Sequence, residues 1–446
     1  MPLPQPNRYI RLFFYFYIAL LIIQGCHILI GLFTADPALI NEFYQFGISD
    51  WLINYESGFV RRGLVGQLLL SLYNTCPFDI GIAIIATTYI SIILLSAVVI
   101  YMFYKHKTSM FILPTAFALG GFFLIKATFY RRDALMLLAI FLTLYLHRQY
   151  LTTSIKRRWL LLATYISGIV SLLIHEAAFF CFVPFLFIHY YTTHQGAIAT
   201  RIGKSAIFTL PYIVTFILSC TCKGNIEMGN TIWYSWSDFF YARYGTQLPM
   251  GVGIEALSWD TIGTFKRHFT INYGGAIEWN IPYMSFLDIQ FPRAIAWIAI
   301  YIVIYYLCAN SNKIRLHERE YDNKHNPINA YQPTILLMQF VALLPMFTLL
   351  SCDLRRVIIY WILTSFFISY QLVALGGSLS IPLLSTASSR IVQFFNNNRI
   401  TSSKWFYLLC TLFVGVPACQ FTIYDYTFST EIFNTLRFIF HAIQQA

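Results

Sequence analysis

Long apolar runs are the feature that most restricts what this chain can fold into. About eleven such runs follow one another along 446 residues, of which 58% are hydrophobic and only 11% are charged. A soluble domain carries about 25% charged residues, whereas roughly 17–25 apolar residues in helical form span the hydrocarbon core of a bilayer. The sequence therefore predicts an all-α, polytopic transmembrane helix bundle of about eleven helices, with residues 1–446 forming a single transmembrane domain.

The predicted spans are separated by polar or charged turns. They lie near residues 12–33, 80–103, 110–130, 134–146, 159–174, 177–189, 206–220, 294–308, 333–350, 357–374 and 405–421. The runs 134–146 and 177–189 are short for a span. No clear small-residue cleavage site follows run 12–33, so we interpret it as a first anchor helix and not as a signal peptide.

Basic residues favour one side of the predicted bundle. Cytoplasmic loops of membrane proteins carry an excess of Lys and Arg. Alternation of the spans puts Arg8, Arg11 and the basic clusters within 105–107, 148–158, 201–204, 313–324 and 390–404 on the same side. This predicts a cytoplasmic N-terminus. The opposite, outer side then receives two longer segments, 34–79 and 221–293, and residues 63–73 of the first are expected to form an amphipathic or re-entrant helix.

Charged side chains gather at four places on this outer side. They are Asp50, Glu56, Arg61 and Arg62; Arg131, Arg132 and Asp133; His175 and Glu176; and Asp353, Arg355 and Arg356. Charges at membrane depth are costly and normally face a bundle interior or a water-filled cavity. One interpretation is internal ion pairing, of Asp133 with an arginine or of Asp353 with Arg355 or Arg356. The other is a pocket for an anionic ligand, because the planar guanidinium group matches phosphate oxygens.

The sequence contains no complete motif for a metal, a nucleotide or a nucleic acid. A zinc protease helix needs His-Glu-x-x-His, but position 179, where the second histidine would fall after His175, is Phe. No metal and no cofactor is expected. Nucleic acid is not an expected partner either, since the net charge of +11 lies in short clusters between apolar runs. His175 is then either a packing residue or a general base or phosphate donor.

The second outer segment is rich in aromatic residues. They are Trp233, Tyr234, Trp236, Phe239, Phe240, Tyr241, Tyr244, Trp259, Tyr273 and Trp279. Trp and Tyr are enriched at membrane interfaces, so an interfacial belt is one interpretation. A sugar-binding surface is the other, in which aromatic faces stack on sugars and nearby carboxylates accept hydroxyl hydrogen bonds.

Two stretches resemble a known group of membrane enzymes. Tyr130-Arg-Arg-Asp-Ala-Leu-Met-Leu-Leu-Ala-Ile-Phe-Leu and Leu173-Ile-His-Glu-Ala-Ala-Phe-Phe-Cys-Phe-Val-Pro184 are similar to segments of EpsG/Wzy-like polysaccharide (O-antigen) polymerases. In these proteins an Arg opens one helix, and a later helix carries His, small residues and Pro. The cluster 353–356 leading into Tyr360 is similar to a later Arg-and-aromatic helix, so the resemblance covers roughly a quarter of the chain.

The resemblance implies a metal-independent glycosyltransferase of the GT-C type in a bacterial inner membrane. Its donor would be a growing glycan on undecaprenyl diphosphate and its acceptor a lipid-linked repeat unit, with a flippase and a chain-length regulator as further partners. The diphosphate would be held by Arg131, Arg132, Arg355 and Arg356, with Arg61 and Arg62 as further candidates. His175 or Glu176 would take the proton from the attacking hydroxyl, with Asp50 or Glu56 as the rival base.

Two other functions remain open from the sequence. A lipid-linked sugar flippase or other transporter is one, although such proteins are expected to show paired repeats and broken helices at mid-membrane depth. A non-catalytic membrane assembly subunit is the other, and it predicts that internal ion pairs use up the arginine clusters.

Overall fold

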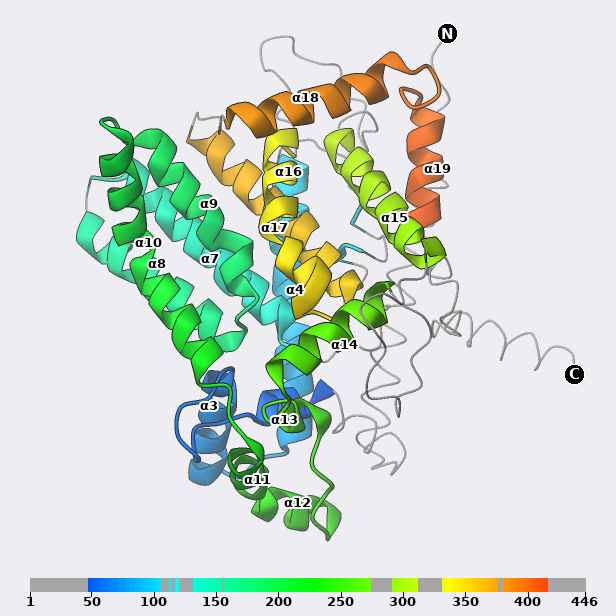
Figure 1. Cartoon of the computed structure of the whole chain (residues 1–446). Coiled ribbons are helices and arrows are strands. Elements are labelled where there is room, and N and C mark those ends of the chain that lie inside the picture. Colours follow the sequence, from blue (N-terminus) through cyan, green and yellow to red (C-terminus); the bar gives the residue numbers. More distant parts are fainter. Residues whose placement is uncertain are drawn as a thin grey trace, which may run out of the picture.

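The computed structural model describes residues 47–105, 112–113, 117–119, 131–154, 156–273, 291–311, 331–375, 379 and 381–415. Within these ranges every regular element is a helix, as the sequence predicts (Figure 1). The predicted spans 12–33 and, for the most part, 110–130 lie outside the described residues. The count of about eleven helices and the GT-C-like arrangement therefore stay predictions.

Four helices are long and apolar enough to cross a membrane. They are α4 (Ile80–Lys105), α7 (Asp133–Thr152), α8 (Arg157–Ile174) and α10 (Ile198–Thr221). In the most apolar stretch of α10, only 22% of the residues are buried inside the protein. Ile207 and Leu210 of this helix are exposed. Apolar surface of this extent is normal against lipid and unusual against water, which supports the prediction of a membrane protein.

Most predicted spans correspond to observed helices. Besides those four, α9 (Ala178–Thr193), α15 (Phe291–Ala309), α17 (Leu354–Ala374) and α19 (Lys404–Gly415) fall on predicted runs. The expectation that run 134–146 would be short is wrong, since α7 has 20 residues. Polar residues such as His147 extend its last turns, and His147 is buried by packing that the hydropathy pattern does not reveal.

The predicted span 333–350 is helical over most of its length but is interrupted, which the sequence analysis did not predict. Helix α16 (Pro333–Ala342) ends well before run 333–350 does, and η4 (Met346–Leu350) is a short π-helical turn. Pro345 lies between them. Proline lacks a backbone N–H and its ring clashes with the preceding turn, which ends or kinks a helix at this point.

The helix expected over residues 63–73 is present as α3 (Gly63–Thr75). It packs against the short 3₁₀ turn η2 (Ser49–Leu52). Close approach requires glycine here, because a Cβ atom on Gly66 would lie 2.0 Å from the carbonyl oxygen of Ile53. This packing fixes η2, which contains Asp50, and the stretch that leads from it into α3, which contains Arg61 and Arg62.

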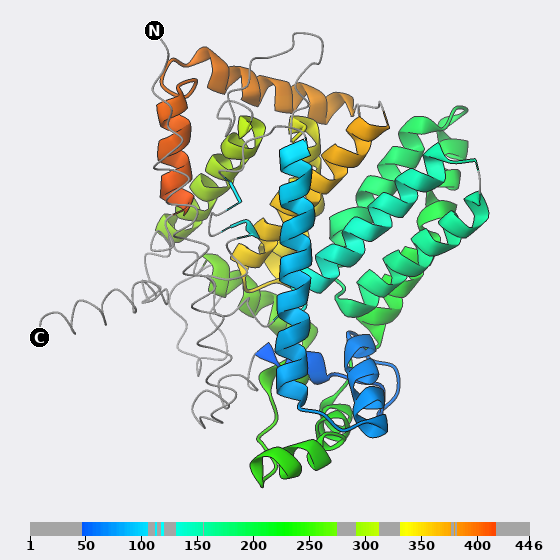
Figure 2. The same ribbon diagram turned by 180° about the vertical axis from the view of Figure 1, so that it is seen from behind.

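The described part of the second outer segment, up to residue 273, forms four short helices: α11 (Ile226–Tyr234), α12 (Ser237–Tyr244), α13 (Val252–Glu255) and α14 (Thr261–Tyr273). Helices α3, α11 and α12 lie beyond one end of the bundle, which we call the α3 end, and α18 (Pro382–Asn397) lies across the opposite end (Figure 1). Helix α4 runs along the bundle between these two ends (Figure 2). Trp236 Nε1 donates to the carbonyl of Leu52 at 2.9 Å, which joins the two outer segments.

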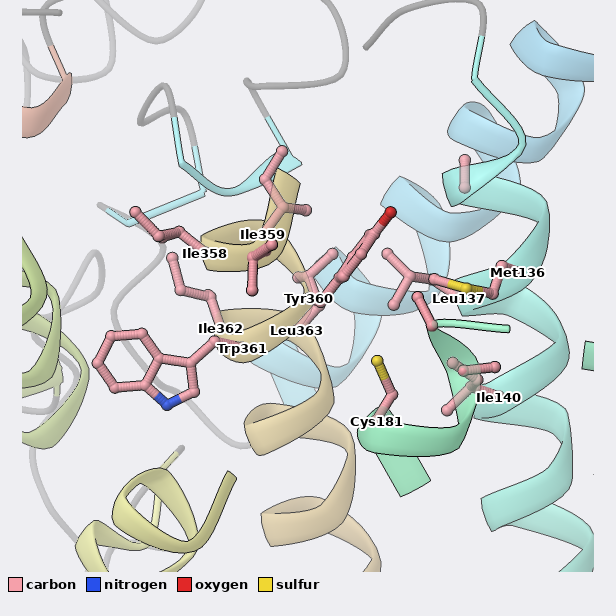
Figure 3. Close-up of a cluster of buried hydrophobic side chains, with 14 of the residues drawn as sticks. Met136, Leu137, Ile140, Cys181, Ile358, Ile359, Tyr360, Trp361, Ile362 and Leu363 are labelled. Atoms are coloured by element: carbon pink, nitrogen blue, oxygen red, sulfur yellow. The ribbon is translucent and has the colours of Figure 1, made fainter. Parts of the chain in front are cut away.

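An apolar seam joins α17 to α7 and α9 (Figure 3). Met136, Leu137 and Ile140 of α7 are buried there, as is Cys181 of α9. The buried Tyr360 side chain of α17 reaches toward α7, with its hydroxyl at the far end from the helix (Figure 3). This packing sets the first turns of α7 and α17 side by side.

Candidate functional site

The four charged stretches recognised in the sequence meet at the α3 end of the bundle. The first stretch lies in η2 and just before α3, and the second lies at the start of α7. The third stretch lies in the turn between α8 and α9, and the fourth lies around the start of α17. Six of their side chains form what we call the arginine–carboxylate network: Asp50, Arg62, Arg132, Asp133, Glu176 and Arg356.

Arg62 joins the first and third stretches. Its Nε donates to Glu176 Oε2 at 2.7 Å, and its Nη2 makes a second, short hydrogen bond to Glu176 Oε1. Its Nη1 donates to Asp50 Oδ1 at 3.3 Å. The Arg62 backbone is left-handed, with φ of 65°, and immediately precedes α3. A non-glycine residue with positive φ is strained, and such strain persists only where the surroundings hold it in place.

Arg132 connects the second stretch to the first. Its side chain is fully buried, its Nη1 donates to the carbonyl of Arg62 at 2.6 Å, and its Nη2 lies 3.1 Å from Asp50 Oδ2. The Nη2 contact is an ion pair without hydrogen-bond alignment, and Arg132 Nε has no hydrogen-bond partner among the described residues. A buried arginine with donors to spare is costly, so Asp50 is essential to holding it there.

Asp133 and Arg356 connect the second stretch to the fourth. Arg356 Nε and Nη2 donate to the two oxygens of Asp133 at 2.7 and 2.6 Å. The Tyr360 hydroxyl donates a short hydrogen bond to the same carboxylate. Asp133 begins α7, where an acidic residue suits the positive helix end, whereas Arg356 in the first turn of α17 does not. The Asp133 carboxylate therefore compensates a charge that α17 alone would disfavour.

His175 is positioned as a neutral hydrogen-bond donor. The backbone N–H of Ala177 donates to His175 Nδ1 at 3.1 Å, so the ring proton belongs on Nε2. Burial, with the charge of Arg62, lowers the pKa of His175 to about 3. A neutral imidazole whose Nε2 already carries the proton is a poor general base, so this geometry favours a donor role over the base role predicted from the sequence.

Two carboxylates of the network are held ionised. Burial alone would raise the pKa of Asp50, but Arg132 and Arg62 outweigh it and hold this pKa well below its usual range. Burial likewise opposes ionisation of Glu176, and Arg62 again outweighs it, so the pKa of Glu176 is also well below normal. Both carboxylates are weak bases for as long as these arginines remain beside them.

The remaining predicted residues divide into near and distant groups. Arg61 is near, since its Nη1 lies 3.8 Å from Glu176 Oε1 and its Nη2 donates to the carbonyl of Ala256 at 3.2 Å. Arg131 lies close enough to add to the field at Asp50, and Arg355 adjoins Arg356. Glu56 is exposed, and its side chain makes no ion pair with any described residue. Its place in the site stays a prediction, and the exposed Gly58 and Phe59 carry the chain over the surface there.

Internal ion pairing, the first interpretation of these clusters, is correct in part. Asp133 does pair with an arginine, Arg356, which lies 223 residues away. The expected pairing of Asp353 with Arg356 is not what the structure has, since both oxygens of Asp133 engage the Arg356 guanidinium. A pairing between residues so far apart in the chain follows from the packing of α7 against α17, and the local sequence does not predict it.

The sequence analysis assigned no role in the site to two residues of this region, Tyr360 and His268. Tyr360 lies one helical turn after Arg356, so its spacing could have indicated a shared partner. His268 of α14 is half-buried, and its Nδ1 contacts the carbonyl of Leu349 at 3.1 Å. Burial lowers the pKa of His268 to about 4, with further effects from Arg267, Arg62 and Arg61. A lone histidine in a long polar segment carries no signal that would single it out.

The proposed sugar-binding surface needs correction. Four of its aromatic residues are buried and form the core of the second outer segment: Trp233, Trp236, Phe239 and Phe240. They cannot stack on a sugar. Tyr234 and Tyr241 are exposed, whereas Trp279 lies outside the described residues. The hydropathy of a loop does not distinguish an aromatic surface from a small aromatic core, because both need the same residues.

Among the described residues, no group of three or more His, Cys, Asp or Glu side chains is arranged to hold a metal ion. Comparison with known proteins adds no name to the site. No protein-family model, curated protein or solved structure matches the chain significantly.

Proposed function

We propose that this protein is a membrane glycosyltransferase that joins polyprenyl-diphosphate-linked repeat units of a cell-surface polysaccharide at the α3 end of the bundle. The observation that carries the proposal is the convergence of four charged stretches, far apart in the chain, on one network there. Arginine forks held in fixed orientations suit a diphosphate, which offers paired oxygens and leaves as an anion.

Each residue then has a role that its geometry allows. Arg61 and Arg62 bind the diphosphate and stabilise it as it leaves, because their side chains are partly exposed. Arg132, which is fully buried, and Arg356, whose side chain is 12% exposed, hold Asp50 and Asp133, so they position the site. His175 donates from Nε2 to a phosphate or sugar oxygen. Among the acidic candidates, Asp50 and Glu176 belong to the network and Glu56 does not.

A non-catalytic membrane subunit is the second candidate, and one observation favours it. The network holds as many carboxylates as arginines, namely Asp50, Asp133 and Glu176 against Arg62, Arg132 and Arg356. A network that is neutral by itself can serve structure alone. The two functions differ in the role of the partly exposed Arg61 and Arg62.

The deciding experiment uses cells in which the native gene is replaced by a variant. Arg62→Lys keeps the charge and loses the fork, while Arg158→Ala, at an exposed arginine of α8 away from the network, is the matched control. Protein level in the membrane and the length distribution of surface polysaccharide are both measured. For a polymerase, Arg62→Lys removes long chains and leaves single-repeat glycan, whereas Arg158→Ala leaves the distribution as in wild type.

Other outcomes point elsewhere. Loss of all surface glycan, single repeats included, would indicate a flippase or transporter. Normal long chains at normal protein level would end the transferase proposal. Shortening that follows protein level alone across variants, including Arg132→Ala and His175→Ala, would indicate the non-catalytic subunit.

A further inference from the structure

The network has one corner that a ligand can reach. The side chains of Arg132, Asp133 and Asp50 are 0%, 1% and 2% exposed, so protein encloses them. Those of Glu176, Arg62 and Arg61 are 18%, 21% and 27% exposed. The side chain of Arg356 is 12% exposed, so Glu176, Arg62 and Arg61 are the more accessible side chains for an anion that approaches the network.

Glu176 occupies the position that an anion would take at this corner. Both of its oxygens accept hydrogen bonds from the Arg62 fork, and Oε1 also lies 3.8 Å from Arg61 Nη1. Arg61 Nε is buried and has no hydrogen-bond partner among the described residues. One carboxylate thus satisfies Arg62 and leaves Arg61 incompletely bonded. A phosphate has one more oxygen to offer and could satisfy both.

The surroundings of Glu176 allow it to leave. It lies in the short turn between α8 and α9, and α9 begins only at Ala178. Arg62 would keep an anionic neighbour on its inner side after such a departure, because Asp50 Oδ1 remains within 3.3 Å of Nη1. Exchange of one anion for another keeps both arginines compensated by negative charge, which avoids the cost of a bare buried charge.

We propose that Arg61 and Arg62 form a phosphate subsite that Glu176 occupies in the free protein, and that the diphosphate of the lipid-linked donor binds by displacing the Glu176 carboxylate. The identity of the donor rests on the proposed function, whereas the displacement rests on the geometry alone. Binding then also prepares the reaction. Glu176 loses the arginine that suppresses its basicity at the moment when the donor arrives.

The chemical step that follows is balanced. The acceptor hydroxyl oxygen bonds to the anomeric carbon of the donor sugar as the bond from that carbon to the diphosphate oxygen breaks. The bonding electron pair leaves with the diphosphate, held by Arg61 and Arg62. The hydroxyl proton passes to the freed Glu176 carboxylate.

A binding experiment tests the exchange without knowledge of the sugar. The full chain is reconstituted in nanodiscs of neutral lipid, and affinity is measured for farnesyl diphosphate and for inorganic pyrophosphate. Glu176→Gln removes the competing charge and is expected to tighten diphosphate binding about tenfold or more, since hydrogen bonds to charged groups are the strong ones. Glu227→Gln, at an exposed glutamate of α11, is the matched control and should match wild type. Arg62→Gln should abolish binding.

The two probes distinguish a lipid diphosphate from a free one. Farnesyl diphosphate that binds more tightly than pyrophosphate supports a lipid-linked ligand, and equal affinities would overturn that part of the proposal. A second variant, Glu176→Asp, retains the charge but draws the carboxylate back by one methylene, and it should tighten binding to a smaller degree.

Two failures have different meanings. If wild type binds diphosphate through Arg62 but neither Glu176 variant binds more tightly, the exchange is overturned and the proposed function stands. If wild type and both Glu176 variants bind neither probe, the diphosphate site is overturned and the proposed function loses its support.

Discussion

Asp133 and Arg356 offer the sharpest test of how this protein is held together. Asp133→Asn keeps the shape of the side chain and removes its charge, which leaves the Arg356 guanidinium without its carboxylate partner. Asp133 accepts two hydrogen bonds from Arg356 and one from Tyr360, and its side chain is 1% exposed. Removing one member of a buried pair costs about 3–5 kcal/mol, so we expect a destabilisation of that size.

The measurement is a double-mutant cycle. Wild type, Asp133→Asn, Arg356→Gln and the double variant are unfolded by SDS in mixed micelles, and tryptophan fluorescence follows the transition. Because the two residues contact each other, the double variant should lose less than the sum of the single variants, by about 0.5–3 kcal/mol. Asp79→Asn is the control. Its ion pair with Arg243 is partly exposed, with side chains 24% and 34% accessible, and such pairs are worth about 0–1 kcal/mol.

Two results would refute this reasoning. The first is a loss on Asp133→Asn no larger than that on Asp79→Asn. The second is additivity of the single variants within error, which would mean that Asp133 and Arg356 do not stabilise each other.

Three further predictions concern neighbouring residues. Gly66→Ala should destabilise the protein by more than about 1 kcal/mol in the same SDS titration, because the added Cβ would force a backbone shift. Gly203→Ala is the control and should be neutral or stabilising, because no atom lies within 4 Å of its Cβ. His175 has its pKa lowered to about 3 by burial, so only the unfolded chain binds a proton there as pH falls below the ordinary value of 6.5. Stability should therefore decline between pH 6.5 and 4.5 by up to about 1.4 kcal/mol per pH unit, and His175→Gln should flatten that slope; an unchanged slope would contradict the burial argument. Finally, Asp50→Asn should lower polysaccharide chain length and protein stability together, while Glu56→Gln should change neither in the gel and unfolding assays, because Asp50 is buried beside two arginines and Glu56 is exposed.

The helices could be predicted from the sequence to a large degree. Apolar runs long enough to cross a bilayer predicted α4, α8 and α10, since hydropathy depends only on which residues are present and in what order. The break after α16 was also accessible in principle, because Pro345 is a local signal for interruption. Local chemistry of this kind acts through neighbours in the chain and can be recognised without coordinates.

Pairing among the charged residues could not be predicted in the same way. That Asp133 pairs with Arg356 and not with a local arginine depends on how α7 packs against α17. The buried state of Trp236 similarly depends on its contact with Leu52, 184 residues away. From the sequence alone, these aromatic residues were open to a sugar-binding interpretation, because the residue type does not show whether the side chain is exposed or buried.

By itself, then, the sequence determined that this chain is helical and apolar, that its charges are confined to short stretches, and that no motif for zinc or nucleotides is present. Only the tertiary structure decided which arginine meets which carboxylate, that Glu56 is exposed, and that Glu176 accepts hydrogen bonds from the partly exposed Arg62 fork. The physical reason is the range of the interactions. Hydropathy and helix breaking act within a few residues, whereas ion pairs act through space and depend on packing between segments that are distant in the chain.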